Sequence, residues 1–289
     1  MFMLKKIIPI YIHCWGGLGS QLYAWALYLD IERKFPKRRI NLVLHSSGVT
    51  QRLPEHLFSN KRDNLISIDD FKYGQEIYNG KSPFFMSSKI LLKRISKLLG
   101  IFAEANTTNE FEILKPTLIA VRGHYSQRKI SDYSLQEIIR ELKNHESSQE
   151  KNLILHSNTA LHYRLGDLLT DGIKNYMSPE HMRNFVNEIS KIWNISTIDV
   201  YSDSPTSVKN MLINLDLEIN VKDTGPINVI CSATKYKYFI GTNSKITIWI
   251  ILIRLFNDIE SYNAIPFQMK GEIEIFYPNI MTFKNFVYF

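Results

Sequence analysis

Short apolar segments rich in β-branched residues alternate with segments of helical periodicity along this chain. At the start, an apolar run at Ile7–Trp15 leads through glycines into a helical run at Gln21–Phe35, and a second apolar run follows at Ile40–Ser47. The alternation returns in the second half, beginning at Thr159–Leu165. Because parallel strands need long crossover connections, this pattern predicts an α/β fold with parallel sheets.

The length of the chain and one polar stretch predict two domains. A chain of 289 residues is long enough for two cores. The polar sequence HESSQEKN, residues 145–152, separates the two halves and has the composition of a linker. We therefore expect an N-terminal lobe over residues 1–150 and a C-terminal lobe over residues 151–289.

The charge of the chain indicates an anionic partner without identifying it. The formal net charge is +7 and the isoelectric point is about 9.2. Nucleic acid, a nucleotide substrate and a membrane surface all fit this charge, and so do lysine-rich solvated faces without a partner. The basic residues are not interleaved with aromatic residues as in known nucleic-acid-binding modules, so no nucleic-acid partner is expected.

Cysteine content and apolar segments favour a cytoplasmic protein. Cys14 and Cys231 are the only cysteines, and their separation fits neither a disulfide framework nor a structural zinc site. The apolar N-terminal run enters the glycine turn with no small-residue cleavage site, so it reads as a strand and not as a signal peptide. The most apolar segment, Ile246–Phe256, is shorter than the ~20 residues that span a bilayer, and a buried helix is expected there.

Four turns carry the residues suited to ligand binding. In the first, Gly17 and Gly19 precede Ser20, so the third glycine of a dinucleotide fingerprint is missing. The glycines either admit a ligand to a helix N-terminus or only form a tight turn. The second turn, HYRLGD at 162–167, places His162 and Arg164 at the end of an expected strand, and an arginine there can hold a phosphate. The alternative is a core histidine beside an ion pair between Arg164 and Asp167.

The other two turns lie further along the chain. YSDSP at 201–205 offers Asp203 or Ser204 as a helix cap. GTNS at 241–244 brings Thr242, Asn243 and Ser244 to the start of the apolar helix, where hydroxyl and amide groups suit a phosphate. No one of the four turns is specific by itself.

Taken in order, these motifs resemble the bacterial α-1,2-fucosyltransferase-like family, whose members use GDP-fucose. The family sequence G-G-L-G-N-Q-L/M-F is matched by GGLGSQLY at 16–23, and G-Y-x-Q by GHYSQ at 123–127 with one inserted residue. H-x-R-R-G-D is matched by HYRLGD at 162–167, F-S-D-D by YSDS at 201–204, and N-S-S-F-S-W-W by NSKITIW at 243–249. The matches span roughly residues 7 to 255.

The resemblance implies a fold of GT-B type, with two Rossmann-like lobes, parallel sheets and a cleft between them. It also implies inverting transfer of fucose to a glycan hydroxyl without a metal or other cofactor. Arg164 inherits the contact with the diphosphate, and His162 is expected near the nucleoside. The donor-binding residues implied in full are Gly17, Gly19, Ser20, His162, Arg164, Asp203, Asn243, Ser244 and Lys245.

The sequence also departs from the family pattern. Leu165 replaces a second arginine, Ser20 replaces an asparagine, and Ile248 replaces a tryptophan. Lys245 and Thr247 stand where the family has serines, and Lys245 is a candidate for the missing positive charge. Two alternatives therefore stay open: a transferase of the same fold with another sugar nucleotide, and a catalytically silent glycan-binding protein.

Two further expectations concern the acceptor. Asp167 is the first candidate for the catalytic base and His124 the second, although Asp167 could instead orient Arg164 and His124 could be a surface residue. The basic, amphipathic segment Ser87–Phe102 fits a helix at an anionic membrane surface, where a lipid-linked glycan acceptor would lie, at the inner face of the cytoplasmic membrane. A core-packed helix with a solvated lysine face fits this segment equally well.

Overall fold

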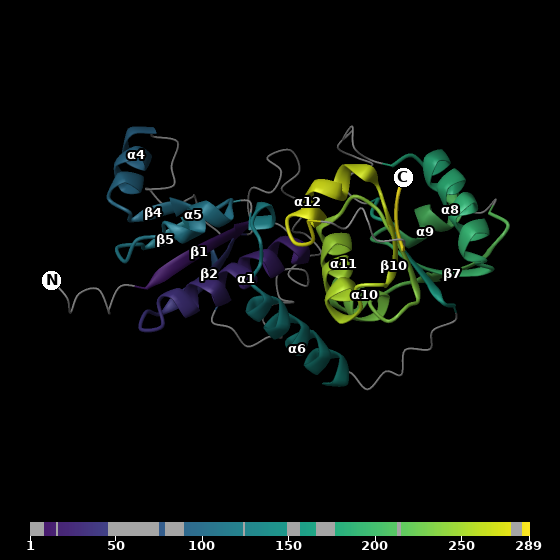
Figure 1. Cartoon of the computed structure of the whole chain (residues 1–289), viewed down its shortest axis with the longest axis horizontal. Coiled ribbons are helices and arrows are strands. Elements are labelled where there is room, and N and C mark those ends of the chain that lie inside the picture. The colour runs from purple at the N-terminus through teal and green to yellow at the C-terminus, as the bar shows by residue number, and fades with distance from the viewer. Residues whose placement is uncertain are drawn as a thin grey trace. The chain divides into compact units, whose positions relative to one another are not determined.

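The protein folds into two compact units, residues 1–141 and 142–289, which we call the N-terminal and C-terminal units (Figure 1). The computed structural model describes residues 9–15, 17–45, 75–78, 90–123, 125–148, 157–165, 177–212, 215–278 and 285–289. Residues 145–148 of the expected linker continue helix α6 (Asp132–Ser148), and the rest of it lies outside the described residues.

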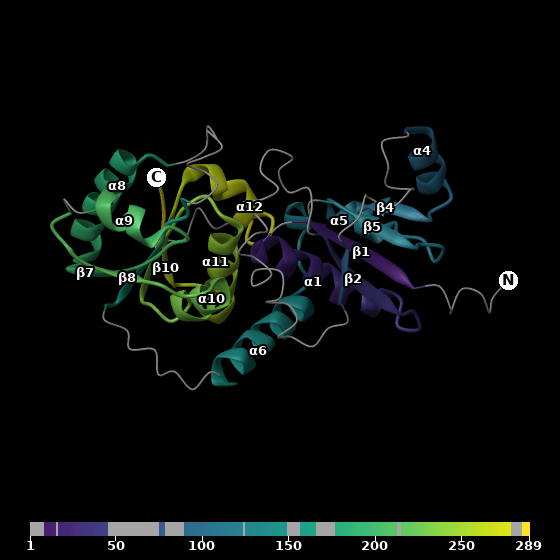
Figure 2. The same cartoon turned by 180° about the vertical axis from the view of Figure 1, so that it is seen from behind.

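The N-terminal unit is built on a five-stranded sheet in the order β3-β2-β1-β5-β4, and every pair of neighbours is parallel. The strands are β1 (Ile10–Trp15), β2 (Ile40–His45), β3 (Gln75–Tyr78), β4 (Phe102–Glu104) and β5 (Ala120–Arg122). The helices are α1 (Leu18–Lys34), α4 (Ile90–Leu98), α5 (Thr108–Glu112) and α6, with a 3-10 turn η4 (Tyr125–Gln127). Figure 2 shows the same elements from behind.

Helix α1 is held in the N-terminal unit by apolar burial and by one ion pair. Tyr23 and Trp25 are fully buried on the helix. Asp30, also on α1, accepts a 2.7 Å hydrogen bond from Arg128 Nη2, and both side chains are buried. A buried pair of this kind holds the helix and the loop after η4 together, since either charge alone would be costly to bury.

The C-terminal unit contains a six-stranded parallel sheet in the order β11-β10-β9-β6-β7-β8. Its strands are β6 (Thr159–His162), β7 (Thr197–Tyr201), β8 (Glu218–Lys222), β9 (Tyr238–Gly241), β10 (Tyr262–Ile265) and β11 (Phe286–Tyr288). Counted from β6, this is the 3-2-1-4-5-6 order of the Rossmann fold. The direction of strand addition reverses between β6 and β9, and ligands bind at such switch points.

Helices connect these strands. They are α8 (Pro179–Trp193), α9 (Pro205–Met211), α10 (Pro226–Ala233), α11 (Lys245–Asn257) and α12 (Lys270–Glu274), with a 3-10 turn η5 (Phe267–Met269). Helix α8 begins as the sequence predicts, because Ser178 caps it by accepting a hydrogen bond from the His181 N–H and Pro179 is its first residue. Helix α11 is buried continuously from Thr247 to Leu255, as its apolar sequence predicts.

The expected α/β architecture of two parallel-sheet units is confirmed, with corrections in local detail. The segment Ser87–Phe102 is not one helix: α4 ends at Leu98, and Phe102 begins β4 with its side chain buried. The strand expected within Thr117–Gln127 is only three residues long. Among the described residues, no helix combines the length and apolarity that a membrane span requires.

Candidate functional site

Three chain segments leave the C-terminal sheet side by side at its carboxyl edge. Residues 163–165 follow β6, residues 202–204 follow β7 and residues 242–244 follow β9, and β6 lies between β7 and β9. Three of the four turns singled out in the sequence therefore meet at the switch point of one sheet. The structure brings together His162, Arg164, Asp203, Asn243, Ser244 and Lys245 at this edge.

Thr242 joins the turn after β9 to the turn after β6. Its N–H and its hydroxyl both donate to the carbonyl of His162, each over 3.1 Å. Its Oγ1 also accepts a 3.0 Å hydrogen bond from the N–H of Arg164. The backbone at Arg164 is thus fixed by a neighbouring strand, which defines where its guanidinium can reach.

Asp203 holds the same turn from the other side. Its Oδ1 accepts a 2.9 Å hydrogen bond from the N–H of Leu165. Of the two cap candidates, Ser204 is the N-cap residue of α9, although its side chain makes no cap hydrogen bond, and Asp203 is not the cap. Asp203 instead positions the backbone that carries Arg164.

His162 is a buried, neutral hydrogen-bonding residue. Its Nδ1 lies 2.8 Å from Oγ1 of Thr247 on α11, a fully buried threonine. Burial, together with the nearby charge of Arg164, lowers the pKa of His162 to about 3. The imidazole is therefore uncharged at neutral pH, and a group with so low a pKa is a poor proton acceptor there.

The start of α11 carries groups of the kind that suit an anion. Ser244 caps this 13-residue helix by accepting a 3.1 Å hydrogen bond from the Ile246 N–H. The partial positive charge of a helix N-terminus favours anions, and Asn243 and Lys245 stand half-buried beside it. Lys245 also faces Glu272 of α12: burial raises the pKa of that carboxyl, and the lysine charge opposes the rise.

We expect a Ser244→Asp variant to separate folding from anion binding. Ser244 is buried, but aspartate caps helices as well as serine does and the helix N-terminus stabilises its charge, so the free energy of unfolding should stay within about 0.5 kcal/mol of wild type. Its charge would repel a bound phosphate at the helix start. Ser244→Ala should show the opposite pattern, losing about 1 kcal/mol of stability with the cap. Chemical denaturation and nucleotide titration of both variants test this, and equal stability losses in the two would contradict it.

Gly241 is required by the close approach of α11 to β9. A Cβ at this position would lie 2.2 Å from Cγ2 and 3.1 Å from Oγ1 of Thr247. Thr247 cannot rotate away freely, since β-branched side chains in helices are restricted and its hydroxyl bonds His162. The glycine therefore permits the contact between His162 and Thr247.

Gly241→Ala is expected to destabilise the protein by about 2 kcal/mol, the usual cost of overpacking a core. The double variant Gly241→Ala/Thr247→Ser should recover most of this loss, because serine keeps Oγ1 and lacks Cγ2. Gly271→Ala is the matched control: its Cβ would meet nothing within 4 Å. Urea denaturation of all three proteins checks the prediction, which fails if the serine gives no rescue.

The glycine turn belongs to the N-terminal unit. Gly17 is the N-cap residue of α1, and its carbonyl accepts hydrogen bonds from the N–H groups of Ser20 and Gln21 at 2.9 and 3.2 Å. A Cβ on Gly17 would meet nothing within 4 Å, so packing does not require glycine here. Gly17 is exposed, Ser20 is half-buried and Gly19 is buried. The turn thus leaves backbone accessible at the start of a 17-residue helix.

The two candidate bases, Asp167 and His124, lie outside the described residues. The described residue next to His124 is Tyr125, whose hydroxyl donates to the carbonyl of His13 over 2.7 Å. Within the described part of the chain, no three His, Cys, Asp or Glu residues are grouped as a metal site would need.

Sequence reasoning missed the supporting role of two threonines. The sequence indicates Thr242 only as a possible phosphate contact, yet its hydroxyl binds the backbone of the β6 turn. It marks Thr247 only as a departure from the family pattern, yet Thr247 is hydrogen-bonded to His162. The available signal was their position: both flank Ser244 at a strand-to-helix turn, where hydroxyl groups find backbone and side-chain partners.

Comparisons with known proteins give only distant structural neighbours. No protein-family model and no curated protein matches the sequence. Similar solved structures include a POFUT1 complex with GDP-fucose, at 12% identity and a TM-score of 0.37, covering 86% of this chain and 95% of that one. An E. coli heptosyltransferase WaaC complex with ADP has 11% identity and a TM-score of 0.46, covering 97% and 92%. A glycosyl transferase family 9 structure from Veillonella parvula has 10% identity and a TM-score of 0.41, covering 89% and 80%.

Proposed function

We propose that the protein is an inverting glycosyltransferase of GT-B type that transfers L-fucose from GDP-fucose to a hydroxyl of a glycan, forming an α-1,2 linkage in a surface polysaccharide such as O-antigen or capsule. The observation that carries the proposal is the meeting of the HYRLGD, YSDS and NSK motifs at one switch point. These motifs are far apart in the sequence, and donor recognition requires that they converge.

The chemistry fits the residues at this edge. Cleavage of the bond between sugar and diphosphate leaves a negatively charged nucleoside diphosphate and an electron-poor sugar carbon. Arg164 would hold the diphosphate, because a guanidinium forms paired hydrogen bonds with phosphate oxygens, and the N-terminus of α11 would take further negative charge. No metal is needed in this scheme, since protein groups stabilise the leaving group.

The incoming acceptor hydroxyl must lose a proton to a base. His162 is unsuited to this role because its pKa lies near 3 and Thr247 holds its ring. We therefore assign the base to Asp167, with His124 as second candidate. In this scheme His162 is a donor-side residue that keeps its neutral ring beside Arg164.

The proposal includes a cytoplasmic location at the inner face of the cytoplasmic membrane, where a lipid-linked acceptor would be reached. Helix α4 supports this placement: Ile95 and Leu98 are 45% and 77% exposed, and Arg94 is exposed beside them. Apolar and basic side chains exposed together suit an anionic membrane surface better than a core-packed helix. Flotation with anionic vesicles tests this placement. Binding should be lost in the Leu98→Ser variant, and it should be lost to the same extent in the wild type at high salt.

A transfer assay tests the activity itself. Purified protein incubated with GDP-fucose and a glycan acceptor, without added metal, should release GDP, and Asp167→Asn should abolish release while leaving GDP binding intact. If only a different sugar nucleotide is cleaved, releasing its nucleoside diphosphate, the result would favour a transferase of the same fold that uses that sugar nucleotide as donor. Glycan binding without nucleotide binding would favour a catalytically silent glycan-binding protein.

A further inference from the structure

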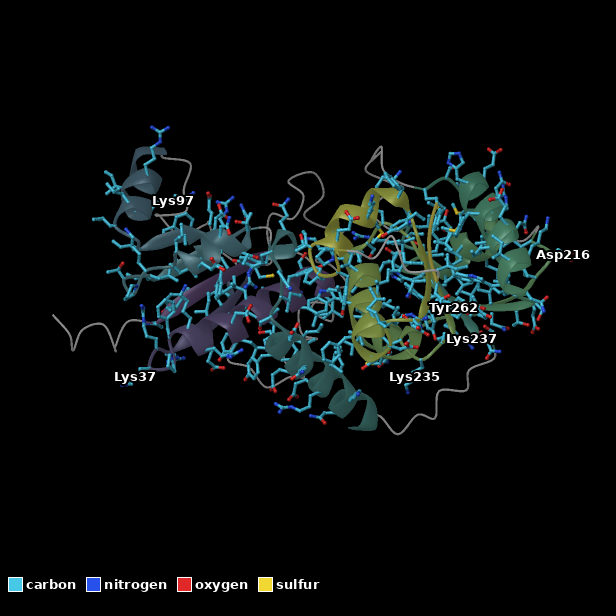
Figure 3. The ribbon with its side chains drawn as sticks, in the orientation of Figure 1. Lys37, Lys97, Asp216, Lys235, Lys237 and Tyr262 are labelled. Carbon is cyan, nitrogen blue, oxygen red and sulfur yellow. The ribbon has the colours of Figure 1, made fainter. Side chains whose placement is uncertain are left out.

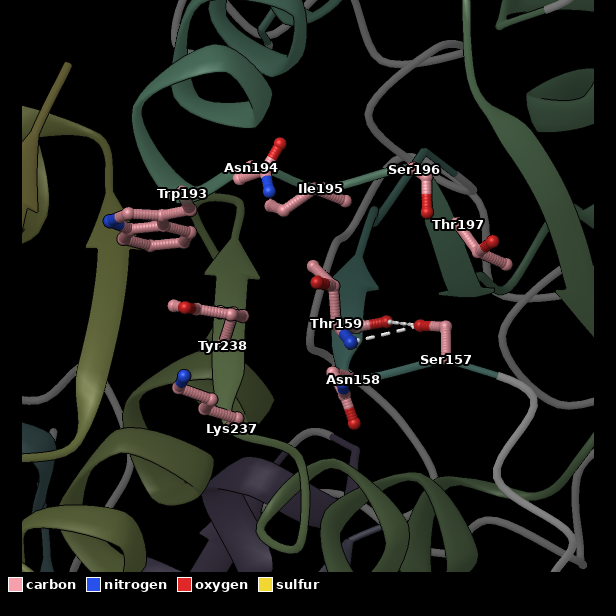
Figure 4. Close-up of a pocket in the computed structure, with 10 residues that line it drawn as sticks. All are labelled: Ser157, Asn158, Thr159, Trp193, Asn194, Ile195, Ser196, Thr197, Lys237 and Tyr238. Atoms are coloured by element: carbon pink, nitrogen blue, oxygen red, sulfur yellow. Dashed lines mark hydrogen bonds between the residues drawn. The ribbon is translucent and has the colours of Figure 1, made fainter.

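A hollow lies at the amino-terminal edge of the C-terminal sheet, opposite the switch-point edge. It has a volume of about 460 Å³, within the range of small-molecule sites. Its walls come from the starts of β6, β7 and β9 and from the end of α8 (Figure 4). The lining residues are Ser157, Asn158, Thr159, Trp193, Asn194, Ile195, Ser196, Thr197, Lys237 and Tyr238. None of these belongs to the switch-point edge.

One side of this pocket is backed by packed aromatic side chains. Trp193 and Tyr238 are stacked, with ring centroids 5.0 Å apart and an angle of 19° between the rings, and Tyr262 packs against both. Lys237 lies with its Nζ 4.9 Å from the centroid of the Tyr238 ring. Figure 3 shows Lys237 and Tyr262 near each other on this part of the unit. Trp193 is buried and Tyr238 is half-buried, so this side offers a ligand little ring surface, together with the ammonium group of Lys237.

The other groups of the pocket offer unused hydrogen-bonding capacity. The side chains of Ser157 and Thr197 have partners, the backbone of Thr159 and the carboxylate of Glu218. In the described part of the chain, no hydrogen bond engages the side chains of Asn158, Asn194 or Ser196, and all three are exposed. Two amides and a hydroxyl are thus available to a ligand.

The electrostatics of the pocket disfavour an anionic ligand. Helix α8 ends at Trp193 with Asn194 as its C-cap, so the negative end of the helix dipole faces this side. The described lining residues include one cation, Lys237, and no acid. A ligand that is neutral and rich in hydroxyl groups matches this mostly polar lining best.

We propose that this pocket is a binding site for a neutral saccharide, which holds a segment of a glycan chain away from the site of transfer. The choice of a saccharide as ligand class rests on the proposed function. The pocket itself is independent of the switch point, because it lies at the other edge of the sheet. A glycan anchored here would raise the local concentration of an acceptor chain at the enzyme.

The test is a binding measurement that needs no nucleotide. We would titrate the full chain with neutral oligosaccharides of hexoses and N-acetylhexosamines and follow binding by saturation-transfer NMR. The variant is Asn158→Ala/Asn194→Gly, in which glycine keeps the left-handed backbone that Asn194 adopts at φ 54°. Loss of two hydrogen bonds should weaken binding at least about tenfold. The matched control, Asn184→Ala, removes an exposed amide of α8 outside the pocket and should bind like wild type.

The outcomes separate this proposal from the proposed function. The proposal is supported if saccharide binding is lost in the double variant and retained in Arg164→Ala, and if the double variant binds GDP as the wild type does. Binding of none of the oligosaccharides, or equal binding by wild type and the double variant, would overturn it even if GDP binds normally. Saccharide binding at the pocket without any nucleotide binding would leave the pocket standing and overturn the transferase.

Discussion

Replacing Arg254 by methionine is expected to lower the stability of the C-terminal unit by about 4 kcal/mol, enough to unfold a marginal domain. Arg254 lies on α11 and is only 3% exposed. Its Nε donates to Oδ1 of Asn263 over 2.7 Å, and its Nη1 and Nη2 donate to the carbonyls of Ala233, Tyr236, Lys237 and Tyr262. All five N–H donors are used.

The size of this effect follows from what methionine would leave behind. Methionine fills the space but removes the donor from five acceptors, three in buried and two in partly buried hydrogen bonds, and each buried loss costs about 1–3 kcal/mol before relaxation. Burial lowers the pKa of Arg254 to about 10, so the guanidinium stays charged at neutral pH. Its bonds join the end of α10 to the starts of β9 and β10.

Urea denaturation followed by circular dichroism measures the loss. Arg254→Lys keeps the charge but has at most three donors, so an intermediate loss is expected. Lys209→Met, at an exposed position of α9, is the control for the change of a basic residue to methionine. A stability of Arg254→Met within 1 kcal/mol of wild type, on the order of a single hydrogen bond, would show that the network is dispensable.

Acidification should destabilise the protein through His162 by about 3 kcal/mol between pH 7 and pH 4. The folded-state pKa is about 3, and the unfolded-state value is the ordinary 6.5. Below pH 6.5 the unfolded chain takes up a proton that the folded chain refuses. The stability that the neutral His162 contributes is therefore fully present above about pH 6.5, falls as the pH drops, and stops falling near pH 3.

The comparison with His162→Gln isolates this contribution. Glutamine does not titrate and can still form a hydrogen bond with Thr247. The carboxylates and other titrating groups therefore contribute equally to the pH dependence of stability in both proteins. The difference in unfolding free energy between wild type and variant should fall by about 3 kcal/mol from pH 7 to pH 4. A difference that does not change with pH would mean that His162 has the same pKa in the folded and unfolded protein, which would contradict this account.

The sequence predicted the architecture because the controlling signals are local. Alternating strand and helix patterns, the Ser178-Pro179 start of α8 and the apolar run of α11 each report on a few neighbouring residues. Chain order then places the HYRLGD and NSK turns at carboxyl ends of strands. Strand order was not predictable, yet it is what makes β6 and β9 neighbours.

The contacts that position the site depend on tertiary structure and were not predictable. Asp203 looked like a helix cap but bonds the backbone of Leu165, 38 residues earlier in the chain. The role of Gly241 follows from the distance to Thr247 on the next helix. Arg254 gave no signal, because a single basic residue in an apolar helix has no pattern from which five partners could be inferred.

The central claim, that the switch point binds a guanosine diphosphate sugar through Arg164, is tested most directly by isothermal titration. The purified protein, without added metal, would be titrated with GDP, UDP, CDP and ADP, together with Arg164→Ala, whose fold is checked by circular dichroism. The account predicts binding of GDP in preference to the other three and loss of that binding in Arg164→Ala. Binding of no nucleotide, or GDP binding that survives in Arg164→Ala, would contradict it.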